Sequence, residues 1–239
     1  MKLDILYDDE SLIVINKSSG LLVHATSIDR NETRFALQML RDQINQKIYP
    51  VHRLDKPTSG ALIFAKSPEI AKGLCDQFAS QKVKKKYLAV VRGKICENIL
   101  IDYPLKEIQD RKVDVRRTLD KQAQSAQTNI RVLQSVELAV PIGRYQTARY
   151  SLIEAEPLTG RQHQIRRHLK HISHPIIGDT NYGSGVHNHF FRENLQSRRL
   201  LLACTQIEFT HPKLKSQLKI IAPLPPCFSG PLARLGLRT

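Results

Sequence analysis

The sequence predicts an α+β protein built on a mixed, mostly antiparallel sheet that is flanked by helices and loops. Three observations predict this class. Short apolar runs typical of strands recur along the chain, two of them are close enough to pair as a hairpin, and segments with helical spacing lie between others. The 239 residues fit one large domain or two small ones and allow a substantial buried core. We expect a single domain over residues 1–239.

The first half of the chain is expected to alternate strands with helices. Residues 5–7 and 11–16 form the hairpin, and the apolar run 61–65 reads as a buried strand. A helix follows, because Ser67 is a suitable N-cap and Pro68 suits the first helical position. Its buried stripe is expected to comprise Ile70, Ala71, Leu74, Phe78 and Cys75, the last as a small buried thiol. An earlier helix over residues 31–44 should bury Leu37, Leu40 and Ile44, and a strand is expected over 84–93.

The second half begins with a polar, poorly periodic segment, in which we expect a loop or insertion around residues 110–125. Strands are predicted over 127–133 and 147–155. After the turn at Gly160, a helix should direct Ile165, Leu169 and Ile172 inward and leave Arg166, Arg167 and Lys170 on other faces. Residues 200–210 and 218–222 are expected to be the closing strands.

The charge of the chain points to a polyanionic partner. Lysine and arginine number 37 against 22 acidic residues, which gives a net charge of +15 and an isoelectric point near 9.9. Residues 81–94 and 159–171 hold much of the excess and contain no acidic residue. Such clustering predicts a nucleic-acid-binding surface, where phosphates are neutralised with release of counterions.

Other function classes are disfavoured by the composition. The four cysteines are widely spaced and form no CxxC pair, which argues against zinc and for reduced thiols in the cytoplasm. His187 and His189 lack the further ligands that a metal site requires. The N-terminus has no signal-peptide core and no apolar run is long enough to span a membrane. We therefore expect a cytoplasmic protein that binds neither a metal nor a membrane.

Asp55 is the strongest candidate for a catalytic residue. It lies in the segment HRLDKPTSG at residues 52–60, where proline, serine, threonine and glycine favour a tight turn before the strand over 61–65. The cationic neighbours Arg53 and Lys56 favour an ionised carboxylate, which nucleophilic or general-base catalysis needs. An aspartate that merely stabilises its own turn fits these residues as well, so the residues alone leave both roles open.

The segment HRLDKPTSG resembles the catalytic motif of the RluA family of RNA pseudouridine synthases. NKSSGLLVH at 16–24 is similar to a second family motif, with Ser18 where proline is usual, and KKYLAVVRG at 85–93 to a third. LTGRQHQIRRHL at 158–169 is similar to a fourth, and HPIIGDTNYG at 174–183 to a fifth that is interpreted as structural. The resemblance runs from Ile5 to about Ala222, and it implies the pseudouridine synthase catalytic fold without an upstream S4 RNA-binding domain.

The resemblance also implies roles for individual residues. Asp55 would be the catalyst, Tyr87 would stack on the target base, and Arg166 would pair with the aspartate. Arg53 would occupy the space vacated by the extruded uridine. His52, Lys86, Arg161 and His163 are further candidates for binding substrate. The isomerisation needs neither a cofactor nor a metal, because no bond is lost overall.

The features around the fourth motif are most similar to a subgroup that modifies uridine 65, in the acceptor-stem region of tRNA. We therefore expect a tRNA substrate, bound by a monomer through the basic surface of its catalytic domain. The same chemistry on ribosomal RNA is the nearest alternative, and an RNA-binding protein without activity is a different class. A metal-dependent nuclease is a more distant alternative. Whether Asp55 attacks covalently or removes a ribose proton stays open.

Overall fold

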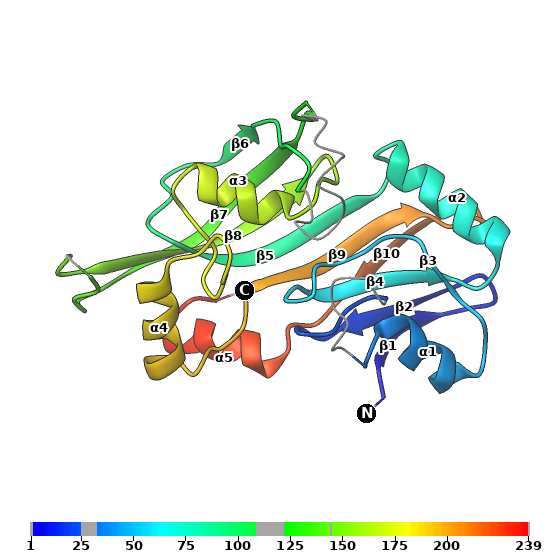
Figure 1. Ribbon diagram of the computed structural model, residues 1–239, viewed down its shortest axis with the longest axis horizontal. Coiled ribbons are helices and arrows are strands. Elements are labelled where there is room, and N and C mark those ends of the chain that lie inside the picture. The colour runs from blue at the N-terminus through cyan, green and yellow to red at the C-terminus, as the bar shows by residue number, and fades with distance from the viewer. Residues whose placement is uncertain (1, 25–32, 109–121, 144, 239) are drawn as a thin grey trace, which may run out of the picture.

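The computed structural model describes residues 2–24, 33–108, 122–143 and 145–238. Most of the loop or insertion predicted around residues 110–125 therefore lies outside the described residues, as do the first two residues of the helix predicted over 31–44. Within the described ranges the chain folds around an extended, twisted sheet with helices along its length (Figure 1).

Ten strands of the described residues form one sheet, in the order β1-β2-β4-β9-β5-β8-β7-β6, with β10 paired to β9 and β3 to β4. Among these pairs only β4 and β9 run parallel, which confirms the predicted mixed, mostly antiparallel sheet. The strands are β1 (Asp4–Asp8), β2 (Leu12–Lys17), β3 (Tyr49–Pro50), β4 (Ser59–Ala65), β5 (Lys84–Arg92), β6 (Ile99–Asp102), β7 (Gln127–Leu138), β8 (Ala148–Pro157), β9 (Leu202–Thr210) and β10 (Gln217–Ile221).

The parallel contact between β4 and β9 requires a glycine. Gly60 pairs with Cys204 and has a φ of 114°, a conformation that residues with a side chain rarely adopt. A Cβ at this position would collide with the backbone carbonyl of Cys204. The glycine that ends the HRLDKPTSG segment therefore lets the strand after the aspartate turn approach β9 closely.

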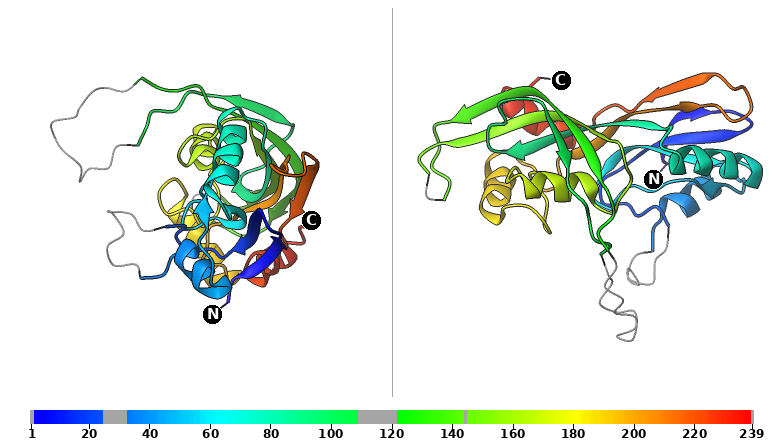
Figure 2. Two further views of the ribbon diagram at one scale, coloured as in Figure 1. Left: turned by 90° about the vertical axis from the view of Figure 1, so that its right-hand side faces the viewer. Right: turned by 90° about the horizontal axis from the view of Figure 1, so that it is seen from above.

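The helices pack on two faces of the sheet and enclose two hydrophobic clusters. α1, α2 and α3 contribute Leu40, Leu74 and Leu169 to one cluster, whereas α4 and α5 contribute Phe191 and Phe228 to the other. Figure 2 shows α1, α2 and α3 on the same side of the sheet. The helices are α1 (Ala36–Ile44), α2 (Pro68–Ala79), α3 (Gln164–His171), α4 (Gly185–Asn194) and α5 (Pro226–Arg234).

The side chains of β5 alternate between these two clusters. Tyr87, Ala89 and Val91 belong to the cluster under α1, α2 and α3, and Leu88 and Val90 belong to the other. Alternation follows from the two-residue period of a strand. Successive residues of β5 therefore face different compartments of the protein.

Many predicted elements are present in the structure. The N-terminal hairpin, the strands at β4 and β5 and the helix that begins after Ser67 are confirmed, and the Ser67 hydroxyl accepts a hydrogen bond from the Ile70 amide, as an N-cap does. The earlier helix begins at Ala36 rather than residue 31. β6, α4 and α5 were not predicted; β6 has only four residues, and Pro231 inside α5 hides its periodicity.

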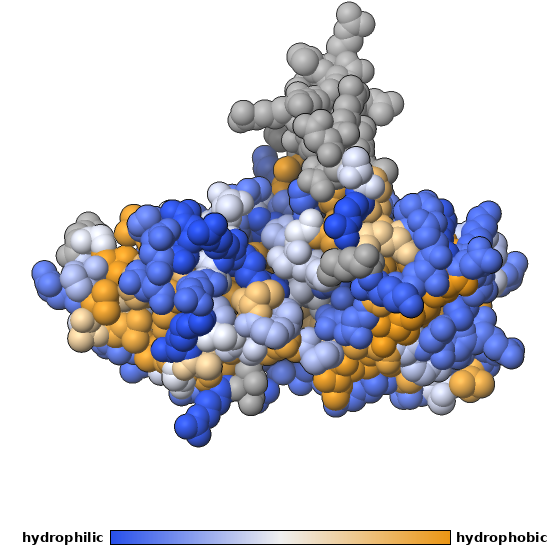
Figure 3. Space-filling model, turned by 90° about the horizontal axis from the view of Figure 1, so that it is seen from below, coloured by the Kyte–Doolittle hydropathy of each residue, from blue (hydrophilic) through white to orange (hydrophobic). Residues whose placement is uncertain are grey.

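Cys75 corrects another expectation, because it is exposed rather than buried. Of the predicted stripe on α2 only Leu74 is fully buried, so this helix packs against β4 and β3 through a narrow contact. On the side of the molecule that carries α1, α4 and α5, hydrophobic patches are interspersed with hydrophilic surface (Figure 3). No helix of the described residues is long and apolar enough to cross a bilayer.

Candidate active site

A cavity of about 730 Å³ lies where the aspartate turn, β5 and the start of α3 meet. Asp55, Tyr87 and Arg166 all line this cavity, although 111 residues separate Asp55 from Arg166. The end of α2 and residues 157–165 complete much of the wall. The structure thus brings the three predicted catalytic residues around one space.

The aspartate turn is held by the segment that follows β2. The ammonium of the buried Lys17 donates to the carbonyl of Lys56 at 3.2 Å, and the Gly20 amide donates to the same oxygen at 2.8 Å. The Ser19 hydroxyl donates to the Pro57 carbonyl at 2.7 Å. Because these bonds cross from one chain segment to another, they fix the backbone on which Asp55 is presented. The sequence reasoning did not find this role of Lys17.

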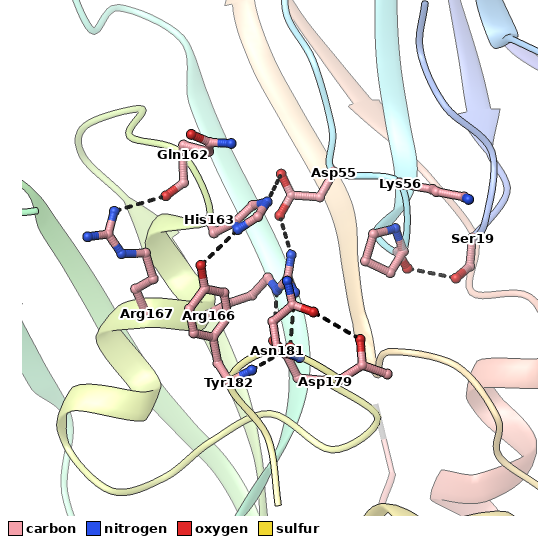
Figure 4. Close-up of polar contacts among 12 residues, drawn as sticks. Ser19, Asp55, Lys56, Gln162, His163, Arg166, Arg167, Asp179, Asn181 and Tyr182 are labelled. Carbon is pink, nitrogen blue, oxygen red and sulfur yellow. Dashed lines mark hydrogen bonds and ion pairs between the residues drawn. The ribbon is translucent and has the colours of Figure 1, made fainter. Parts of the chain in front are cut away.

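Arg166 joins two carboxylates, as Figure 4 shows. Its Nη1 donates to Asp55 Oδ2 at 3.1 Å, while its Nε and Nη2 donate to the two carboxylate oxygens of Asp179 at 2.7 and 2.9 Å. Burial acts to lower the pKa of Arg166, but the bonds to Asp179 and Asp55 raise it overall. Arg166 was expected on a face away from the core, yet it is buried, because the two carboxylates neutralise it there.

Asp179 lies in the segment over residues 174–183 that was interpreted as structural, and it is linked to Asp55 through Arg166, which binds both carboxylates. Its Oδ1 also accepts the backbone amides of Asn181 and Tyr182, at 2.9 and 3.0 Å. Burial alone would raise the pKa of Asp179, but the bonds from Arg166 and these amides lower it. An aspartate after Gly178 in a turn gave the only local signal, and nothing in it indicated Arg166 as the partner.

His163 lies near the carboxylate oxygen of Asp55 that Arg166 does not bind. Its Nε2 lies 3.8 Å from Asp55 Oδ1, and its Nδ1 lies 3.0 Å from the Tyr182 hydroxyl. The residue adopts a left-handed conformation with φ of 53°, which ends the preceding turn and begins α3. Burial lowers the pKa of His163, although Asp55 acts in the opposite direction. A neutral imidazole whose Nδ1 accepts a hydrogen bond from the Tyr182 hydroxyl carries its proton on Nε2, which faces Asp55.

Tyr87 lies on the cavity wall with 9% of its surface exposed. It pairs with Cys204 across β5 and β9. Burial raises the pKa of Tyr87 well above its ordinary value, and Cys204 and Asp55 add to the effect. The ring is therefore a neutral aromatic surface, which suits stacking against a pyrimidine.

The other predicted substrate-binding residues do not all face the cavity. Arg53 and Arg161 are exposed and line it. His52 also lines it, but its Nε2 accepts the Ile63 amide at 3.0 Å, and burial lowers its pKa to about 3, with a further contribution from Lys85. Lys86 does not line the cavity; it forms an ion pair with Glu154 at 3.2 Å, whereas its neighbour Lys85 does line it.

Within the described ranges, no group of three or more histidine, cysteine, aspartate or glutamate side chains is placed to hold a metal ion. His187, one of the two histidines considered above, lies 2.9 Å from the Tyr150 hydroxyl through its Nδ1. Its partner in the sequence motif, His189, lies 2.7 Å from Arg192.

The site is thus an aspartate held by a buried arginine at the wall of a cavity on a mixed sheet. The human structure named "RNA Pseudouridylate Synthase Domain Containing 4" has this fold, with a TM-score of 0.72 and 27% identity, covering 99% of this chain and 94% of that one. A second human structure, "RNA Pseudouridylate Synthase Domain Containing 1", also gives a TM-score of 0.72, at 24% identity over 95% of this chain and 86% of that one. The fold is that of pseudouridine synthases.

The family model of RNA pseudouridylate synthases matches residues 11–171. The "tRNA pseudouridine synthase C" of Vibrio cholerae is 47% identical over 234 residues, which cover 98% of this chain and 96% of the relative. The protein of the same name from Haemophilus ducreyi is 50% identical over 222 residues, 93% of this chain and 91% of the relative. This chain therefore belongs to the RNA pseudouridylate synthase family, as its motifs predicted.

Proposed function

We propose that this protein converts uridine to pseudouridine in tRNA, at position 65 in the acceptor-stem region, with Asp55 as the catalyst. The relatives that match nearly the whole chain are named for a tRNA substrate. The observation that carries the catalytic assignment is the contact between Asp55 and the buried Arg166 at the cavity wall. The surplus of 15 positive charges supports a nucleic-acid substrate.

The substrate uridine must leave its stack before it can reach Asp55. Extrusion from a paired stem costs roughly a few kcal/mol. Arg53 is exposed beside the aspartate, where a guanidinium can enter the vacated space, and the neutral ring of Tyr87 offers the extruded uracil a stacking surface. The binding energy of the remaining RNA contacts offsets this cost.

The isomerisation then exchanges one bond to the ribose for another. The bond from C1′ to N1 breaks, the uracil rotates, and C5 forms the new bond to C1′; C5 loses its proton and N1 gains one. Asp55 begins this sequence, and two opening moves fit its position, attack on the ribose or removal of a ribose proton. Arg166 Nη1 donates to Oδ2 of this carboxylate and so holds it in place for either move.

The test is a pseudouridine map of total RNA from a strain without this gene, complemented with the wild-type protein or with Asp55→Asn. We expect one tRNA site to lose its pseudouridine, wild type to restore it and Asp55→Asn to leave it unmodified. Loss at a ribosomal RNA site would favour the alternative substrate. Unchanged maps would favour a binding protein without activity, and full restoration by Asp55→Asn would exclude Asp55 as the catalyst.

Three further properties of this enzyme are proposals of the same kind. We infer a single domain, a monomer and a cytoplasmic location, all of which suit an enzyme that acts on free tRNA. Sedimentation of the purified protein tests the monomer, since a dimer would have about twice the mass. Limited proteolysis tests the single domain, and fractionation of cells tests the location.

A further inference from the structure

Lys85 is a partly buried cation on the cavity wall that has no counter-ion. Neither a hydrogen bond nor an ion pair joins its ammonium to any residue in the described part of the chain. Its Nζ instead lies 5.8 Å from the centre of the Phe78 ring. Burial lowers the pKa of Lys85. A partly desolvated charge without a counter-ion is unfavourable, and the contact with the Phe78 ring offsets only part of this cost.

The adjacent Lys86 shows how different the two sides of β5 are. Lys85 lies on the same face of β5 as Tyr87, which lines the cavity. Lys86 lies on the other face, with Leu88 of the second hydrophobic cluster. On that opposite side Lys86 binds Glu154, which Arg131 also contacts at 3.2 Å. One lysine is therefore neutralised within the protein, and its neighbour is left for a ligand.

In the part of the chain that the structure describes, no group neutralises the ammonium of Lys85, so the ligand that suits this position is an anion. Phe78 is apolar, and the neutral His52 stacks on Phe78 with ring centroids 4.6 Å apart. The carboxylate of Asp55 forms its ion pair with Arg166, which also binds Asp179. Glu107 also lines the cavity, but among the described residues no carboxylate, Glu107 included, forms an ion pair with Lys85.

We propose that the ammonium of Lys85 binds a backbone phosphate of the RNA next to the extruded uridine. Residues two apart on one face of a strand are separated by about 6–7 Å. This spacing is comparable to the separation between a pyrimidine and the phosphate of its own nucleotide, so a base stacked on Tyr87 brings a phosphate to Lys85. The assignment rests on the proposed function, because it requires an RNA substrate in this cavity.

The test compares Lys85→Met with Lys86→Met, using an unmodified tRNA transcript whose binding is measured at several salt concentrations. We expect Lys85→Met to weaken binding about tenfold at low salt and to reduce the slope of log affinity against log salt by about one. Lys85→Arg should retain most of the affinity. Lys86→Met should stay near wild type, because its charge is already compensated by Glu154.

If Lys85 had only a structural role, Lys85→Met would lower the melting temperature together with RNA binding. The RNA-binding role predicts that only RNA binding falls. Methionine has a similar length and no charge, so we expect Lys85→Met to melt at the wild-type temperature or above it, while its RNA binding falls. A second measurement uses RNAs with single neutral methylphosphonate linkages around the mapped uridine. One linkage should weaken binding to the wild-type protein and have no further effect on Lys85→Met.

Wild-type affinity and salt slope in Lys85→Met would overturn the inference, as would an equal loss in Lys86→Met. A fall in kcat with an unchanged salt slope would also overturn it, because that result indicates contact with the uracil. These outcomes are distinct from failure of the proposed function, in which the wild-type protein itself forms no pseudouridine in tRNA.

Discussion

Asp55 and Asp179 bind the same guanidinium but in very different surroundings. The side chain of Asp179 is fully buried and receives two bonds from Arg166 and two from backbone amides. The side chain of Asp55 retains 19% exposure, accepts one bond from Arg166, and has its second oxygen 3.8 Å from His163. Asp179 thus has its acceptor capacity used within the protein, and Asp55 has capacity left for a substrate.

The difference separates a positioning carboxylate from a reactive one. A buried carboxylate with four bonds is a weak nucleophile and a weak base, because each donor stabilises its charge. Asp179 instead fixes the plane of the Arg166 guanidinium, from which the remaining Nη1 points to Asp55. The arrangement holds Asp55 in place with one bond while its side chain lines the cavity.

The largest expected effect is on activity. Asp55→Asn should reduce the rate of pseudouridine formation by about 10³-fold or more, because the amide is neither nucleophile nor base. Its free energy of unfolding should change by less than about 1 kcal/mol, since Arg166 keeps both bonds to Asp179. Single-turnover assays and urea denaturation measure the two quantities. A large loss of stability in this variant would remove the distinction between the two aspartates.

Asp179→Asn should have the reverse profile. Removal of one partner from a buried ion pair leaves Arg166 poorly compensated, so we expect the free energy of unfolding to fall by about 3 kcal/mol. Activity should also fall, because Arg166 is no longer fixed. Asp76→Asn is the matched control: Asp76 is exposed on α2, and the substitution should be neutral. Wild-type stability of Asp179→Asn would contradict the positioning role.

The contribution of Asp179 to the stability of the protein can also be tested by its dependence on pH. The folded-state pKa of Asp179 lies below its ordinary value of 3.8, so the folded protein binds this proton less readily than the unfolded chain. Its stabilising effect is therefore fully present above the ordinary value and is lost as the pH falls through the folded pKa. The stability difference between wild type and Asp179→Asn should be constant from about pH 5 to 7 and shrink below about pH 4. A difference independent of pH would exclude this carboxylate as its source.

The smallest effect is expected at Tyr182. Tyr182→Phe removes the hydroxyl that contacts His163 and keeps the ring 5.1 Å from the Arg166 guanidinium. We expect a loss of about 1 kcal/mol in stability and a reduction in kcat of about three- to tenfold, with KM for tRNA unchanged. Tyr103→Phe is the control, since no hydrogen bond of its hydroxyl occurs among the described residues. A larger loss in the control would show that the effect is not specific to the contact with His163.

The sequence by itself determined the motifs and the local structure around them. Turn-forming residues placed Asp55 before a buried strand, Ser67 and Pro68 marked the start of α2, and the order of the motifs identified the family. These features follow from interactions between residues close in the chain, which local patterns report well. The two-residue period of β5 also contained the information that Lys85, rather than Lys86, accompanies Tyr87.

Only the tertiary structure decided which residues complete the site. The bond between Arg166 and Asp55 spans 111 positions, and Asp179 is the second partner of Arg166 because the turn after α3 packs against that helix. The exposure of Cys75 likewise depended on how little of α2 the sheet covers. A periodic pattern shows which face of an element is apolar, but the pairing of strands far apart in the chain decides what lies against that face.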